Sequence, residues 1–248
     1  MSVKTVPRLQ LEGISRTFPL ADGRHRAVLD DISLTVNPGE FVSIIGSSGC
    51  GKSTLFNIIA GLDSPTSGTV GIDGEVAYMP QKDVLFPWRS IAANAALGLE
   101  VQGVKRRAAR ARVKDWFPRF GLAGFEDSLP FELSGGMRQR AALLRTVVQN
   151  KSTLLLDEPF GALDALTKQD LQTWLQQVWA EHNWTALLIT HDVREAILLS
   201  DRVVVLSPRP AKVSLILDVD LPKPRGIDAL TSPRFLELER TLLQTLGS

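Results

Sequence analysis

The chain contains a single cysteine, Cys50, among its 248 residues. One cysteine cannot form an internal disulfide or a zinc site built on several thiolates, and it favours a reducing compartment. Net charge is also nearly absent, because 28 Lys and Arg residues are balanced by 27 Asp and Glu residues. Such a chain has no overall field to attract nucleic acid or an anionic membrane. Any such partner must be recognised locally.

Long hydrophobic runs are missing as well. No stretch approaches the ~18 apolar residues that span a bilayer, and residues 1–10 lack the apolar segment of a signal peptide. We therefore expect a protein that is neither exported nor itself a membrane channel. No internal repeat or low-complexity tract divides the chain, and 44% hydrophobic residues is typical of a globular protein. These features predict one domain over residues 1–248.

The hydrophobic pattern indicates an α/β fold. Strands are expected at residues 9–15 and 33–36, around a polar turn at 21–26, and again at 41–45. Apolar runs at 154–156, 187–190 and 203–206 are typical of strands covered on both faces in a parallel sheet.

Helices are expected between these strands and in the tail. One begins at Ser53, with apolar residues at helical spacing and Gly61 near its end; these are Leu55, Ile58, Ile59 and Leu62. Another has one apolar stripe, which places Trp174 and Trp179 in the core rather than in a ligand site; the stripe is Leu171, Trp174, Leu175 and Val178. The tail, about 207–248, carries an apolar run at 213–219 and a helix at 235–246.

A glycine-rich loop follows the strand at 41–45. It fits the phosphate-binding pattern of two glycines with four residues between them, followed by Lys and Ser; its residues are Gly46, Ser47, Ser48, Gly49, Cys50, Gly51, Lys52, Ser53 and Thr54. Backbone N–H groups of such a loop converge on phosphate oxygens, Lys52 reaches the β- and γ-phosphates, and the Ser53 hydroxyl ligates Mg²⁺. The sequence therefore predicts an ATP site. Cys50 is interpreted as a small passive residue of this loop.

Two acidic residues, Asp157 and Glu158, follow the apolar run at 154–156. The carboxyl end of a strand is the edge at which open α/β sheets bind ligands. Asp157 can hold Mg²⁺ through its water shell, and Glu158 can orient the water that attacks the γ-phosphorus or accept its proton. Without the phosphate loop, a helix cap beside a solvated acid would explain both residues.

Further motifs resemble those of the ATP-binding cassette (ABC) ATPases over nearly the whole chain. Residues 133–137, Leu-Ser-Gly-Gly-Met, resemble the family signature, and Gln81 resembles its Q-loop glutamine. Residues 161–164 resemble its D-loop, which ends at Asp164, and His191 resembles its switch histidine. The resemblance implies a phosphate-loop NTPase fold with a parallel-sheet core, an antiparallel β subdomain and a helical signature subdomain at about residues 85–150.

The resemblance also implies roles for these residues. Gln81 would join Ser53 and Asp157 at Mg²⁺, His191 would bind the γ-phosphate, and Phe18 would lie against adenine, although a core phenylalanine is the alternative. Ser134, Gly135 and Gly136 open a helix and form an anion site that would close over ATP held by a second copy, in a head-to-tail dimer. Met137 replaces the glutamine most common at the fifth signature position, and we expect activity to survive this.

The segment at 83–89 resembles the part of transporter cassettes that meets a membrane permease. Exposed Phe86 and Trp88 would suit a small helix docking in a groove, the alternative being a loop folded onto its own domain. This segment, with residues 49–51, 133–140 and 159–164, looks most like ATPases of the nitrate, sulfonate and taurine importer family, which includes carriers of thiamine-pyrimidine precursors. That family implies a permease, a periplasmic or extracellular substrate-binding protein, and a peripheral location on the cytoplasmic face of the membrane.

Other functions remain as alternatives. An exporter or lipid-transport ATPase is the nearest one. Non-transport ABC ATPases are disfavoured, because no heptad insertion and no second cassette are present. The basic residues of 105–114 spread around a helix and indicate a solvated face rather than a nucleic-acid site, so no nucleic-acid partner is expected.

Overall fold

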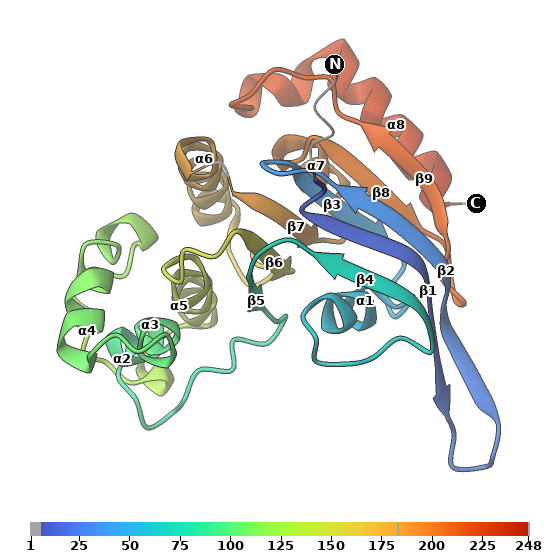
Figure 1. Cartoon of the computed structure of the whole chain (residues 1–248). Helices are drawn as coiled ribbons and strands as arrows, with labels where there is room; N and C mark the ends of the chain where they lie inside the picture. The colour runs from blue at the N-terminus through green and yellow to red at the C-terminus, as the bar shows by residue number, and fades with distance from the viewer. Residues whose placement is uncertain (1–5, 183, 248) are drawn as a thin grey trace.

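The computed structural model describes residues 6–182 and 184–247, and its strands form two sheets (Figure 1). The smaller sheet is antiparallel with the order β2-β1-β4, and its strands are β1 (Leu9–Pro19), β2 (His25–Val36) and β4 (Ser67–Ile72). The larger sheet has the order β5-β6-β7-β3-β8-β9, and its strands are β3 (Phe41–Gly46), β5 (Val76–Met79), β6 (Thr153–Asp157), β7 (Thr185–Ile189), β8 (Arg202–Leu206) and β9 (Val213–Asp218). Five of these strands, β5, β6, β7, β3 and β8, run parallel, and β9 pairs antiparallel with β8 at the edge. The expected parallel core and antiparallel sheet are confirmed.

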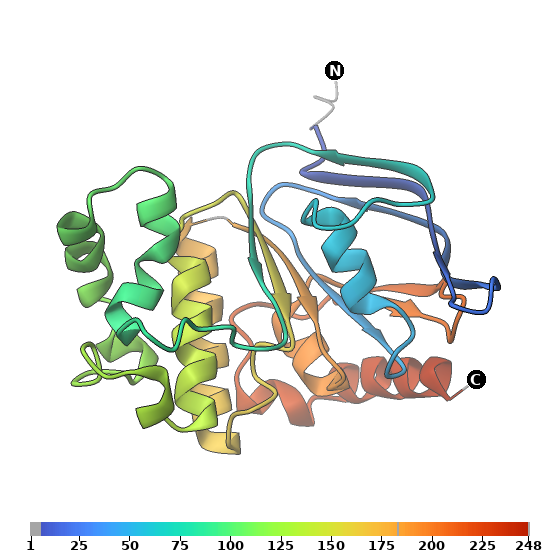
Figure 2. The ribbon, with the colours of Figure 1, turned by 90° about the horizontal axis from the view of Figure 1, so that it is seen from below.

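The core of the larger sheet explains the short apolar runs of the sequence. Every residue of β6 and β7 is buried, so neither strand alternates polar and apolar side chains. Helix α1 (Lys52–Ile59) lies between the two sheets (Figure 2). It contributes Leu55 and Phe56 to a cluster that also contains Leu11 of β1 and Ile44 of β3.

The remaining helices are grouped at two places in Figure 1. One group extends from the β5–β6 edge of the sheet and contains α2 (Ile91–Ala95), α3 (Leu97–Val101), α4 (Arg106–Lys114), α5 (Gly135–Val147) and the short 3-10 helices Pro118–Phe120 and Pro130–Glu132. The others are α6 (Ala165–His182), α7 (Val193–Leu199), the 3-10 helix Ile227–Thr231 and α8 (Pro233–Leu246). No helix among the described residues has the length and apolar character needed to cross a bilayer.

Two details of the predicted elements are wrong. Leu62 does not continue the apolar stripe of α1, because the helix ends at Ile59, Gly61 adopts φ 70°, and Leu62 is 69% exposed. The first hairpin is also longer than predicted, since Phe18 pairs with Arg26 and Pro19 with His25. Main-chain pairing continues there through partly or fully exposed residues that show no alternation, so the sequence pattern alone ended the strands too early.

The tail is attached to the sheet domain through a buried arginine. Arg225 is 4% exposed, and its guanidinium donates five hydrogen bonds, all to main-chain carbonyls. Two of these carbonyls, of Ile197 and Ser200, lie at the end of α7, where a cation also complements the helix dipole. The others belong to Val219 and Leu221. The guanidinium therefore joins the segment before α8 to the carboxyl end of α7.

Candidate active site

The loop between β3 and α1 closes on its own lysine. The Lys52 ammonium donates hydrogen bonds to the carbonyls of Gly46 (2.8 Å) and Ser47 (3.0 Å). Glycine is required at two positions: a Cβ on Gly46 would lie 2.9 Å from the Leu206 carbonyl, and Gly51 adopts φ 131°. The sequence therefore folds here into the expected strand, loop and helix. The lysine can exchange its two carbonyl partners for phosphate oxygens.

Asp157 is a buried carboxylate at the end of β6. It is 2% exposed, and this burial raises the pKa of its carboxyl group, against the opposing effects of a Ser53 hydrogen bond and the Lys52 charge. A desolvated carboxylate is costly unless positive charge lies nearby. Its position beside the Ser53 hydroxyl therefore favours a bound cation.

Glu158, the next residue, contacts two residues of other predicted motifs, Gln81 and His191. Its Oε2 accepts a hydrogen bond from Gln81 Nε2 (3.1 Å), and its Oε1 is 3.5 Å from His191 Nδ1. Its main chain adopts φ 50°, with the N–H donating to the Ile189 carbonyl (2.9 Å) and its own carbonyl accepting from Gln139 Nε2 (3.1 Å). A positive φ is uncommon for a residue other than glycine, and such conformations cluster at active sites.

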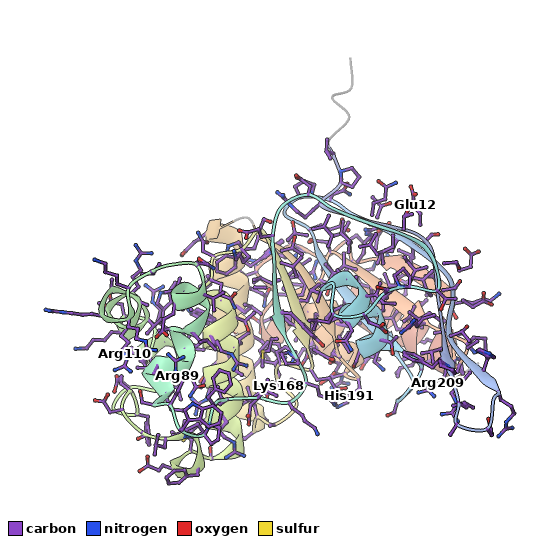
Figure 3. The ribbon with its side chains drawn as sticks, turned by 60° about the horizontal axis from the view of Figure 1, so that its bottom comes forward. Glu12, Arg89, Arg110, Lys168, His191 and Arg209 are labelled. Atoms are coloured by element: carbon purple, nitrogen blue, oxygen red, sulfur yellow. The ribbon has the colours of Figure 1, made fainter. Side chains whose placement is uncertain are left out.

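A cavity of about 450 Å³ joins these groups at one edge of the sheet. It is lined by residues from the phosphate loop, α1, the last residue of β7 and the loops after β5, β6, β7 and β8: Ser48, Gly49, Gly51, Lys52, Ser53, Thr54, Gln81, Glu158, Ile189, His191 and Arg209. Lys52, Glu158 and His191, all predicted from sequence to act on ATP, therefore share one cavity. Figure 3 places His191 and Arg209 at the same edge of the molecule.

Arg209 is a residue of this cavity that the sequence motifs did not indicate. It follows β8 in a turn with Pro208 and Pro210, and a Cβ on Gly49 would lie 3.3 Å from its Nη2. Because β8 pairs with β3, with Leu206 opposite Gly46, the loop after β8 emerges beside the phosphate loop. A basic residue after a buried strand is the only signal in the sequence, and its meaning depends on the strand order.

Other predicted residues lie outside the lining of the cavity. Gly46 and Ser47 face Lys52, and Cys50 is buried at 2% exposure. Phe18 is half-buried beneath the Arg16 guanidinium, 4.4 Å from its ring centroid, and packs against the core that contains α1. These contacts within one chain are those expected if Phe18 is a core residue, which is the alternative interpretation.

The signature residues lie at the start of α5 and do not line the cavity. Ser134 caps that helix, with its hydroxyl accepting from Met137 N (3.3 Å), and both Ser134 and Gly135 are exposed. Gly136 lies next to the D-loop, since a Cβ there would be 3.3 Å from the Ala162 carbonyl. Met137 is half-buried and packs against the helical core. Within one chain, the signature and the phosphate loop are thus separate.

Phe86 and Trp88 lie in an exposed aromatic pair. Trp88 is 74% exposed, Phe86 is 37% exposed, and their ring centroids are 5.2 Å apart. Phe86 also lines a groove of about 370 Å³ together with Val84 and Val101, whereas Trp88 does not. The fully buried Asn94 fixes this segment through hydrogen bonds to Phe86 N (2.8 Å) and to the carbonyls of Phe86, Arg89 and Ser90.

Comparison with known proteins gives consistent matches. A family model described as ABC transporter matches residues 29–161. An aliphatic sulfonates import ATP-binding protein of Bacillus cereus is 41% identical over 244 residues, covering 95% of this chain and 94% of that protein. A bicarbonate transport ATP-binding protein of Synechococcus elongatus is 42% identical over 249 residues, and the chain spans 38% of its length. A solved dimeric ATP-binding cassette in a post-hydrolysis state, bound to ADP and Pi, superposes with a TM-score of 0.79 at 27% identity, covering 86% of this chain and 100% of that one.

Proposed function

Because the chain belongs to the ABC transporter family, whose cassettes bind and hydrolyse ATP, we propose that it is the ATPase subunit of an importer for a small anionic or heterocyclic nutrient. The observation that carries the ATPase assignment is the cavity that joins Lys52, Glu158 and His191. The import function and the nutrient class rest on the sulfonate and bicarbonate relatives. Nitrate, sulfonates, taurine, bicarbonate and pyrimidine precursors are the candidates.

The residues of the cavity suggest a division of roles in hydrolysis. Backbone N–H groups of the phosphate loop and the Lys52 ammonium hold the β- and γ-phosphates. Glu158 orients a water molecule and takes its proton as the water oxygen bonds to the γ-phosphorus, while the bond from that phosphorus to the bridging oxygen breaks and ADP leaves. His191, beside Glu158, holds the γ-phosphate in line.

The residues present fit a magnesium ion. The buried Asp157 carboxylate, the Ser53 hydroxyl bonded to it and the amide oxygen of Gln81 are oxygen donors of the kind that Mg²⁺ prefers. When bound, the ion would neutralise charge on the β- and γ-phosphates.

Arg209 adds a second cation to the Lys52 side of the cavity. No hydrogen bond or ion pair to its guanidinium occurs among residues 6–182 and 184–247, and it lies over Gly49 of the phosphate loop. An unpaired guanidinium at this place suits a phosphate oxygen of ATP.

A second copy of the chain completes each ATP site in this proposal. Ser134, Gly135 and Gly136 form an exposed helix start that supplies N–H groups to an anion but does not line the cavity of its own chain. Asp164 is exposed in the neighbouring loop and would contact the second copy. The dimeric arrangement of the related cassette supports this pairing.

The membrane partner is proposed to bind at Phe86 and Trp88. Two exposed aromatic rings, one of which lines a groove, are suited to hold a short helix of a permease, and hydrogen bonds to Asn94 fix their segment. The chain would thereby lie on the cytoplasmic face of the membrane, and a separate substrate-binding protein would deliver the nutrient to the permease. Nothing in the site selects the nutrient itself.

Copurification tests the ATPase subunit and its membrane partner together. Tagged Glu158→Gln protein is trapped with Mg-ATP in cells of its source, the membranes are solubilised gently, and copurifying proteins are identified by mass spectrometry. We expect a polytopic permease, and nutrient uptake by the reconstituted complex then gives direction and cargo. Lys52→Ala protein, which should not bind ATP, is the matched control. Recovery of nucleic acid or of non-membrane proteins alone contradicts the transport function.

A further inference from the structure

Lys168 connects the loop that carries Asp164 to the turn that carries His191. It lies in the first turn of α6, where its backbone N–H donates to the Asp164 carbonyl over 2.9 Å. Its ammonium reaches α7, 2.7 Å from Asp192 Oδ2 and 2.8 Å from Glu195 Oε2. Figure 3 places Lys168 near His191 at the bottom edge of the molecule. One residue therefore touches both segments.

The carboxylate of Asp192, one of the two that Lys168 binds, fixes the main chain that follows His191. Asp192 Oδ1 caps α7 by accepting from the backbone N–H groups of Arg194 (3.0 Å) and Glu195 (3.2 Å). The Asp192 N–H donates in turn to Thr190 Oγ1 over 3.1 Å. The residues on both sides of His191 are thus bonded to each other, and one of them is bonded to Lys168.

The His191 side chain has little packing of its own to hold it. It is 69% exposed, and among the described residues its only side-chain hydrogen bond or ion pair is the 3.5 Å approach to Glu158. Its position relative to the γ-phosphate site is therefore set by the main chain of residues 190–192. A displacement of Asp192 would move the imidazole with it.

The ion pairs of Lys168 with Asp192 and Glu195 hold α6 strongly to α7. Glu195 is 3% exposed and also accepts a hydrogen bond from Gln172 Nε2 (3.0 Å). Burial raises the pKa of Glu195, and the ammonium of Lys168 opposes this rise. Burial would raise the pKa of Asp192 as well, but the hydrogen bonds from Lys168 and α7 lower it below its ordinary value. Removing the lysine would leave a buried carboxylate without a counter-charge, which is strongly unfavourable.

We propose that Lys168 is a positioning residue for hydrolysis, which transmits the position of the Asp164 loop to His191. This inference rests on the proposed function, in which Asp164 faces the second copy and His191 faces the γ-phosphate. When the second copy closes and shifts the Asp164 loop, α6 and its lysine carry the shift to Asp192. Lys168 itself touches neither ATP nor the attacking water, because it does not line the ATP cavity.

Substitution of Lys168 separates this role from a purely structural one. In Lys168→Met we expect kcat to fall by about tenfold or more with KM within about twofold, because misplacement of a catalytic group costs rate rather than binding. Lys168→Arg should recover most of kcat, since a guanidinium can bind both carboxylates. Lys151→Met is the control, because Lys151 is a half-buried lysine with a 2.7 Å ion pair to Glu75, remote from the ATP cavity.

A double variant addresses loss of stability. Lys168→Met with Glu195→Gln removes the unpaired buried charge, so its Tm should return toward that of the unmodified protein while kcat stays low. Recovery of kcat in the double variant, or an unchanged kcat in Lys168→Met, overturns the inference. An unmodified protein that does not hydrolyse ATP would instead contradict the proposed function.

Discussion

The side-chain amide of Gln81 donates a hydrogen bond to Glu158 over 3.1 Å. Gln81 follows β5 and Glu158 follows β6, and these strands are parallel neighbours, so both residues leave the sheet at the same edge. The loop after Gln81 continues to Phe86 and Trp88, the proposed permease contact. A change at that contact can therefore reach Glu158 through a single loop.

This hydrogen bond gives a prediction for Gln81→Ala. The variant loses both the amide that orients Glu158 and an oxygen donor for Mg²⁺, so we expect the steady-state ATPase rate to fall by about tenfold or more. ATP affinity should change little, because the phosphate loop is intact. Gln102→Ala is the control, because it removes a side-chain amide that donates to the Gln149 carbonyl, away from the ATP cavity. An ATPase rate equal to that of the unmodified protein contradicts the role given to Gln81.

Asp157→Asn should stabilise the ATP-free protein while abolishing hydrolysis. The buried carboxylate has a raised pKa, so its ionised form opposes folding at neutral pH, whereas asparagine carries no charge. A gain of about 1 kcal/mol would raise Tm by roughly 2–4 °C for a chain of this size. Thermal unfolding at neutral pH without nucleotide measures it.

The pH dependence of that gain has a definite sign. As pH falls through the raised pKa of Asp157, the native carboxyl binds a proton and its penalty disappears. The difference in Tm between Asp157→Asn and the unmodified protein should therefore be largest at neutral pH and shrink toward acid pH. A difference that grows on acidification would show that the carboxylate is stabilised in the native state.

The aromatic pair Phe86 and Trp88 is predicted to bind the permease without serving hydrolysis. Replacing both by alanine should weaken binding to the permease by about 30-fold or more, the value expected for a central aromatic contact of about 2 kcal/mol. The ATPase rate of the separate protein should be retained. Leu243→Ala is the control, because Leu243 is a 53% exposed apolar residue of α8. Undiminished copurification of the permease would place the contact elsewhere.

Arg209 is predicted to strengthen nucleotide binding through its charge. Arg209→Gln should weaken ATP binding by up to about fivefold, the upper range for an exposed ion pair, and Arg209→Lys should recover part of the loss. Because the guanidinium is exposed, the effect should diminish as ionic strength rises. Equilibrium binding of ATP at low and high salt measures both. Arg107→Gln is the control, because Arg107 is an exposed residue of α4, and it should leave ATP binding unchanged. If Arg209→Gln binds ATP as tightly as the unmodified protein, Arg209 is not part of the site.

The parts of the site that the sequence predicts are those encoded by neighbouring residues. The loop from Gly46 to Thr54 and the strand before Asp157 each carry their own pattern, and the structure places both at the expected ends of β3 and β6. Arg209 and Lys168 have no such pattern. Arg209 matters only because β8 lies beside β3, and Lys168 only because α6 packs beside α7. Contacts between segments distant in sequence depend on strand order and helix packing, which periodicity does not report.

The buried Arg225 makes the attachment of the segment before α8 to the end of α7 insensitive to acid and to salt. The hydrogen-bond partners of its guanidinium are main-chain carbonyl groups, which do not titrate, and the guanidinium lies inside the protein where counterions do not screen it. The nearby ion pair between Arg194 and Glu239 of α8, with an arginine side chain 61% exposed, has neither property. In acidic or concentrated electrolyte, the surface link from α7 to α8 would therefore loosen first, while the segment before α8 remained in place.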